Sequence, residues 1–265
     1  MPPSGPRPHP LNRAFSWSAP RLPFQILSED QAQSYDQHGY FLLEGAFTDE
    51  EIDDVEQAIA PFEKKSEDAL RAYGKGISIA RADQITFTVH LVKSSNVLKQ
   101  FSRHPVFQRL CHDLLGTRAR LYWDQAVYKK PGNPEEFPWH QDNGYTYVEP
   151  QQYLTCWVPL TEATLDNGCP WVAPGLHKSG TFDHWDSPNG KQCLTDPEGP
   201  IAVPAKRGDI VVFSSLTPHR TGPNLTAQTR KTYVLQYAPD GSAAFPEGLE
   251  GSIQQNDEER QYLIT

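Results

Sequence analysis

Apolar residues in the first half of the chain recur at helical spacing. The stretch 28–39 begins with serine and ends with glycine, which is typical of a capped helix. In 47–73, Thr48 and Glu51 stand at capping-box spacing, and apolar residues recur every three or four positions. A third amphipathic pattern covers 104–116, with proline near its start and glycine at its end. The first half therefore predicts helices.

From about residue 119 the period changes to two. Short β-type runs, separated by Gly, Pro, Asn and Asp, occupy 119–132, 153–163, 169–175, 208–215 and 231–240. Helices followed by many short strands predict a mainly β fold with flanking helices, a sandwich or barrel buttressed by the N-terminal helices. The Gly-, Pro-, Asp- and Ser-rich segment 178–200 is predicted to be a long insertion between strands, and such loops often act as lids.

Composition narrows the class of protein. The chain has 265 residues, 37% of them hydrophobic and 22% charged, as in ordinary globular domains. A net charge of −9 without a basic stripe argues against nucleic acid as a partner. No apolar run has the roughly 18–20 residues of a membrane span, so no membrane partner is expected. The four cysteines form no Cys-x-x-Cys pair, and 1–22 is a Pro-rich tail without a signal-peptide core that either drapes over the domain or stays disordered. We expect reduced thiols, a flexible tail and a cytoplasmic protein.

The stretch "EEFPWHQDNGY" carries the candidate chemistry. It places His140 and Asp142 two positions apart, and residues at i and i+2 of a strand share a face. With 9 His and 33 acidic residues, about one such pair is expected by chance, so a plain surface pair is the alternative. However, His219 follows another strand-like run, and Arg230 opens the next one. Two histidines and a carboxylate form the facial triad of non-haem Fe(II) oxygenases, and an arginine offers a fork for a carboxylate.

These segments occur together in a known family. "YDQHGYFLLEGAFTDEEI", "LYWDQAVYKKPG", "PWHQDNGY", "KRGDIVVFSSLTPHRTGPN" and "TRKTYVLQY" appear here in the family's order. From about residue 28 to 240 the chain resembles the phytanoyl-CoA dioxygenase family of Fe(II)/2-oxoglutarate-dependent oxygenases. The resemblance implies a cupin-like double-stranded β-helix, or jelly roll, with its core at about 119–240 of a single domain, 23–265.

The resemblance also implies roles for particular residues. His140, Asp142 and His219 match the iron ligands. Arg230 matches the residue that pairs with the distal carboxylate of 2-oxoglutarate, and Thr221 matches a hydroxyl that helps to hold it.

Further positions match the two pockets of the family. Those expected beside the cosubstrate are Tyr128, Trp157 and Gln125, although core packing is the alternative for the first two. Those expected on the substrate side are His90, Phe137 and Tyr145. The segments expected to form the rim are 64–90, 132–137, 143–150 and 178–200.

The implied activity needs Fe(II), 2-oxoglutarate and O2. It oxidises, most simply by hydroxylation, an unactivated C–H bond of a small-molecule substrate and releases succinate and CO2. Because Asp142 occupies the ligand position, we expect oxidation and not chlorination. Two alternatives stay open. One is a catalytically silent, metal-binding jelly roll that serves as a sensor or structural module, and the other is a cupin-type metalloenzyme that does not use 2-oxoglutarate.

Overall fold

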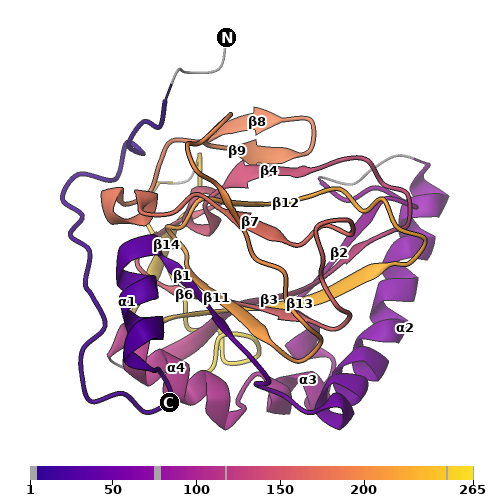
Figure 1. The fold of residues 1–265 in the computed structure, drawn as a ribbon, viewed down its shortest axis with the longest axis horizontal. Helices are drawn as coiled ribbons and strands as arrows, with labels where there is room; N and C mark the ends of the chain where they lie inside the picture. The colour runs from indigo at the N-terminus through magenta and orange to yellow at the C-terminus, as the bar shows by residue number, and fades with distance from the viewer. Residues whose placement is uncertain (1–4, 75–78, 117, 249, 265) are drawn as a thin grey trace.

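Two facing β-sheets form the centre of the molecule, and helices cover the outer side of the larger sheet (Figure 1). The computed structural model describes residues 5–74, 79–116, 118–248 and 250–264. In Figure 1 the strands β7, β12 and β4 lie above those of the larger sheet, and α3 and α4 lie below it. The arrangement confirms the predicted jelly roll with N-terminal helices.

Four α-helices are found in the described ranges, where three were predicted. They are α1 (Glu29–His38), α2 (Asp49–Tyr73), α3 (Asn96–Phe101) and α4 (Pro105–Leu115). Ser28 and Thr48 each close a capping box at the start of a helix, as their spacing predicted. Three short 3-10 turns, which no pattern indicated, are η1 (Leu91–Lys93), η2 (Asp142–Gly144) and η3 (Leu176–Ser179). They are too short to show a hydrophobic period.

The larger sheet has six antiparallel strands. In spatial order they are β1 (Tyr40–Leu43), β11 (Ile210–Ser214), β6 (Leu154–Pro159), β13 (Arg230–Pro239), β3 (Ala119–Lys129) and β2 (Ile85–Val89). The smaller sheet is β10 (Ile201–Ala202), β7 (Pro170–Val172), β12 (His219–Thr221) and β4 (Phe137–His140). A third sheet contains β15 (Ile253–Gln254), β14 (Ala243–Phe245) and β5 (Tyr147–Glu149).

Side chains along the strands of the larger sheet point alternately to its two faces, and each face packs into its own apolar core. Side chains on its outer face, such as Tyr128 and Tyr233, pack among those of the helices. Side chains on its inner face, such as Val127, Trp157 and Val234, pack toward the smaller sheet. Polar groups that point inward from the larger sheet therefore enter the space between the two sheets.

The segment 178–200 contains a two-stranded hairpin, β8 (Trp185–Ser187) and β9 (Gly190–Gln192), which Figure 1 shows beside β4. The backbone N–H of Cys193 donates to the carbonyl of Trp139 in β4, at 2.8 Å. The N–H of Lys191 donates to the hydroxyl of Tyr145, at 3.2 Å. The insertion is thus attached to the outside of the smaller sheet.

The segment 5–22 runs along the surface of the domain. The Trp17 ring meets the edge of the His177 ring at 4.4 Å, and its Nε1 donates to Asp36 at 2.8 Å. The Asn12 amide donates to the carbonyls of Ser179 and Thr181. Residues 1–4 of the predicted tail lie outside the described ranges. None of the described helices has the length and hydropathy of a bilayer-spanning segment.

Candidate metal centre

Two histidines and one aspartate converge between the sheets. His140 and His219 are direct neighbours across the antiparallel pair of β4 and β12, with ring centroids 4.1 Å apart. One carboxylate oxygen of Asp142, Oδ1, lies 3.9 Å from the Nε2 atom of each histidine. One donor atom from each of the three residues lies within 4.8 Å of the others, so one ion can contact all three.

The route by which Asp142 reaches the centre differs from the prediction. The strand β4 ends at His140, and Asp142 opens the turn η2. The two side chains converge because the backbone turns after the strand, and not because two alternate residues of one strand share a face. The backbone N–H of Tyr145 closes this turn on the Asp142 carbonyl at 3.2 Å.

Backbone carbonyls orient both imidazoles. The Nδ1 atom of His140 lies 2.8 Å from the Pro138 carbonyl, and that of His219 lies 3.0 Å from the Thr217 carbonyl. A carbonyl only accepts, so each Nδ1 carries the proton and each Nε2 presents its lone pair to the centre.

Burial keeps the histidines neutral. It lowers the pKa of His140 to about 3 and that of His219 to about 4, so both can bind a cation at pH 7. Burial also raises the pKa of Asp142, while the Thr155 hydroxyl donates to its Oδ2 at 2.6 Å. This bond leaves Oδ1 for a metal. Two neutral imidazoles and a carboxylate fit Fe(II) with open coordination positions.

Arg230 lies on the inner face of the larger sheet, and only 1% of it is exposed. Its guanidinium carbon lies 5.3 Å from the Trp157 ring, and its Nη1 donates to the Thr232 hydroxyl. Its Nε and Nη2 are buried and have no hydrogen-bond partner among the described residues. Burial lowers its pKa to about 10, which still leaves a cation at pH 7. Two unpartnered N–H groups suit the distal carboxylate of 2-oxoglutarate.

A second buried cation, Lys129, was not predicted. Its Nζ donates to the Gly222 carbonyl at 2.5 Å and to the Thr221 hydroxyl at 3.3 Å. Burial first, and then the charge of Arg230, lowers its pKa to about 7. Its alternation with Gln125 and Val127 on β3 could have indicated an inward side chain.

A cavity of about 580 Å³ opens onto His140 and Asp142. Besides these two ligands it is lined by Phe137 and Tyr145, which were predicted on the substrate side, and by Gln125, which was predicted beside the cosubstrate. The α2 and β2 parts of the predicted rim also contribute, including Leu70, Phe87 and Val89, whereas none of the residues that line it comes from 178–200. Residues 75–78 of the predicted rim lie outside the described ranges.

Two predicted residues point elsewhere. Tyr128 belongs to the core under the helices, on the opposite face of the sheet from Arg230, because side chains alternate along β3. His90 is not among the residues that line the cavity; its ring meets that of Trp123 at 4.3 Å, and its Nε2 contacts Arg260. Trp157 lies beside Arg230 but does not line the cavity either.

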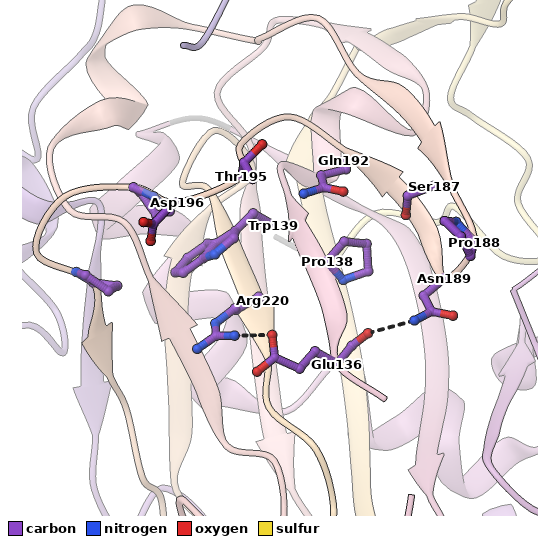
Figure 2. A pocket seen from close by; sticks show the side chains of 12 residues that line it. Glu136, Pro138, Trp139, Ser187, Pro188, Asn189, Gln192, Thr195, Asp196 and Arg220 are labelled. Carbon is purple, nitrogen blue, oxygen red and sulfur yellow. Dashed lines mark hydrogen bonds and ion pairs between the residues drawn. The ribbon is translucent and has the colours of Figure 1, made fainter. Parts of the chain in front are cut away.

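A separate hollow of about 330 Å³ lies on the outer side of the smaller sheet (Figure 2). The guanidinium carbon of Arg220 lies 5.4 Å from the Trp139 ring and 5.1 Å from the Trp171 ring, and the guanidinium pairs with Glu136. On β12, Arg220 alternates with His219 and Thr221, so it points away from the centre. This hollow contains none of the three converging ligands.

A His–Asp–His centre inside a jelly roll, beside a buried arginine, defines the class of Fe(II)/2-oxoglutarate-dependent oxygenases. The family model of phytanoyl-CoA dioxygenase (PhyH) matches residues 35–232. The chain therefore belongs to this family and is a dioxygenase of that class.

Relatives and solved structures agree with this assignment. The chain is 27% identical over 238 residues to an ectoine dioxygenase of Bordetella bronchiseptica, covering 80% of this chain and 75% of that one. It is 30% identical over 149 residues to a phytanoyl-CoA dioxygenase of Arabidopsis thaliana, a match that spans 52% of this chain and half of the Arabidopsis protein. The crystal structure of EctD from S. alaskensis with 2-oxoglutarate and 5-hydroxyectoine superposes with a TM-score of 0.67 at 23% identity, over 93% and 86% of the two chains. The carbocyclase SnoK from nogalamycin biosynthesis gives 0.72 at 20% identity, over 95% and 100%.

Proposed function

We propose that the enzyme hydroxylates an unactivated C–H bond of a small molecule and converts 2-oxoglutarate and O2 to succinate and CO2. The observation that supports this most directly is the convergence of three ligands, two of which, His140 and Asp142, line a cavity large enough for a substrate. When bound there, Fe(II) supplies the activation of O2 that carbon–hydrogen oxidation requires.

The residues around the metal have distinct tasks. Nε2 of His140, Nε2 of His219 and Oδ1 of Asp142 would hold the ion, which leaves the remaining positions for cosubstrate and oxygen. The carbonyls of Pro138 and Thr217 fix the two rings, so that each ligand meets the metal in one orientation.

The cosubstrate would be held by Arg230 and Lys129 of the larger sheet together with Thr221 of the smaller one. The unpartnered N–H groups of Arg230 would bind its distal carboxylate, beside the hydroxyl of Thr221 and the ammonium of Lys129. The Trp157 ring supports the guanidinium from one side. A buried guanidinium that is held rigidly can fix the orientation of a dicarboxylate, whereas a solvated, mobile side chain cannot.

The carboxylate of Asp142 also constrains the reaction. With a metal bound, its Oδ1 would be an anionic ligand and would leave no room at that position for a halide ion. Products formed in chloride buffer should therefore carry added oxygen or have lost hydrogen, and should contain no chlorine.

The test is succinate formation from 2-oxoglutarate with Fe(II) and ascorbate, followed by mass spectrometry of the substrate's product in chloride buffer under labelled O2. His219→Ala should abolish turnover and metal binding. His112→Ala is the matched control, because this histidine is half-exposed on α4, far from the ligand set in the fold. Full activity of His219→Ala, a chlorinated product, or turnover that does not require 2-oxoglutarate would each refute the proposal.

A further inference from the structure

The described residues that line the cavity of about 580 Å³ are uncharged apart from the metal ligand itself. Among the described residues that line it, Asp142 is the one with a formal charge at pH 7, and no lysine or arginine is present. The buried cations Lys129 and Arg230 do not line it. Arg260, which contacts His90 beside Trp123, already pairs with Asp257 at 3.0 Å.

Aromatic rings form the wall beside the metal ligands. The Phe137 ring meets the edge of the His140 ring at 4.8 Å and lies 5.7 Å from the Phe87 ring. The Tyr145 ring lies nearly parallel to that of Phe137, at 6.4 Å and 14°. Flat apolar surfaces close to the reacting position favour a ring-shaped substrate over a flexible polar one.

Neutral hydrogen-bond donors complete the wall. Tyr122, Tyr153 and Gln125 line the cavity, and the Gln125 side chain accepts from the Trp123 Nε1–H through its Oε1 and carries its donors on the NH2 group. Burial raises the pKa of Tyr122 to about 12, so its hydroxyl stays a donor at pH 7. Such donors satisfy carbonyl or hydroxyl oxygens, but they do not compensate the burial of a full negative charge.

We propose that the primary substrate is an uncharged, ring-containing molecule that carries carbonyl or hydroxyl oxygens, and that the cavity rejects small carboxylates and phosphonates. This inference rests on the proposed function, because it takes the cavity beside the ligands as the substrate site. A volume of about 580 Å³ suits a drug-sized molecule. A relative from Gimesia maris, 36% identical over 129 residues, is named methylphosphonate hydroxylase, after an anionic substrate.

The experiment compares two probes that differ in charge and share a ring system, 2-acetylnaphthalene and 2-naphthoate. Binding to the Fe(II)- and 2-oxoglutarate-loaded enzyme is measured without oxygen, by saturation-transfer NMR. The neutral ketone should bind at least tenfold more tightly. Equal or tighter binding of the carboxylate, or no binding of the ketone up to its solubility, would overturn the proposal. Because no turnover is involved, this outcome is independent of succinate formation, which tests the proposed function by itself.

A variant tests whether charge is the cause. Ala69 is an exposed residue of α2 that lines the cavity, so Ala69→Lys adds a cation to the wall without disturbing the core. It should tighten 2-naphthoate binding at least fivefold and leave the ketone within twofold. The matched control is Ala72→Lys, on the same helix and exposed, at a position that does not line the cavity. An equal effect of both lysines would show that overall charge, and not the wall, decides binding, and would contradict the proposal.

Discussion

At the scale of single residues, Lys129 is the least expected feature of the centre. A fully buried lysine usually needs an acidic partner, yet this ammonium donates to the backbone carbonyl of Gly222 and the hydroxyl of Thr221. Besides burial, the charges of Arg230 and Arg220 lower its pKa, and those of Glu136 and Glu135 raise it, with a result of about 7.

This pKa predicts a pH-dependent affinity for 2-oxoglutarate. The dianion binds the protonated ammonium better, so affinity is full below pH 7 and falls as the pH rises and free enzyme loses that proton. The dissociation constant should rise by up to about tenfold per pH unit above 7. Isothermal titration of the metal-loaded enzyme without oxygen, between about pH 6 and 9, measures it.

Lys129→Met is the control, because it keeps the aliphatic stem and removes the charge. Its dissociation constant should be higher and nearly independent of pH over the same interval. If the methionine variant kept the wild-type slope, another group would be responsible for the pH dependence.

Arg230 should contribute more than Lys129 to cosubstrate binding. Arg230→Ala removes a charge-assisted fork worth a few kcal/mol, so the KM for 2-oxoglutarate should rise by about a hundredfold. Metal affinity should stay nearly unchanged, since His140 and His219 lie on the other sheet and Asp142 lies on the turn that follows it. Arg230→Lys should restore only part of the affinity, because an ammonium offers no parallel pair of donors. Unchanged KM in Arg230→Ala would remove this role.

At the scale of elements, the junction of α1 and β1 supports the metal centre through close packing. Gly39 has φ of +82°, and a Cβ there would lie 2.4 Å from the Thr217 hydroxyl and 2.7 Å from the His177 ring. Thr217 in turn holds the His219 ring through its carbonyl. Gly39→Ala should therefore destabilise the fold and also weaken metal binding.

Gly45 provides a matched comparison. It has φ of +60°, but a Cβ there would meet nothing within 4 Å. Gly45→Ala should cost about 1–2 kcal/mol from backbone strain alone. Gly39→Ala should cost about 1–3 kcal/mol more, from overpacking, and only it should lower metal affinity. Urea unfolding and metal titration of both variants test this; equal losses in both would show that the contact with Thr217 is unimportant.

Spacing along the sequence was sufficient to identify the two histidine ligands, but it was insufficient to decide which face of the sheet some neighbouring residues occupy. His140 and His219 were recognisable from their motifs. The structure places them on β4 and β12, which were not among the predicted strands and which pair directly. On β3, Gln125 and Tyr128 stand three positions apart, and a regular strand cannot turn both to one face. The strand is buried on both sides near its end, so hydrophobicity alone did not show which side was inner.

At the scale of the whole molecule, the segment 5–22 connects parts that are distant in sequence. Trp17 reaches Asp36 in α1 and His177 in η3. Trp17→Ala should lower the free energy of unfolding by about 2 kcal/mol, less than for a fully buried tryptophan, because Trp17 is partly exposed. Leu22→Ala, at a side chain that is 70% exposed, should change it by less than about 0.5 kcal/mol. Thermal denaturation distinguishes the two; equal midpoints would mean that the segment does not stabilise the domain.

The residues that would hold the metal and the cosubstrate lie on two separate layers, and this has a consequence for the life of the protein in a cell. His140 and His219 belong to the smaller sheet, whereas Arg230 and Thr155, the partner of Asp142, belong to the larger one. Iron together with its cosubstrate would therefore connect the two sheets. A ligand that binds only the folded chain stabilises the folded state. Protein without bound iron should unfold more often and be degraded faster. The abundance of the enzyme, and not only its rate, would then follow the iron supply.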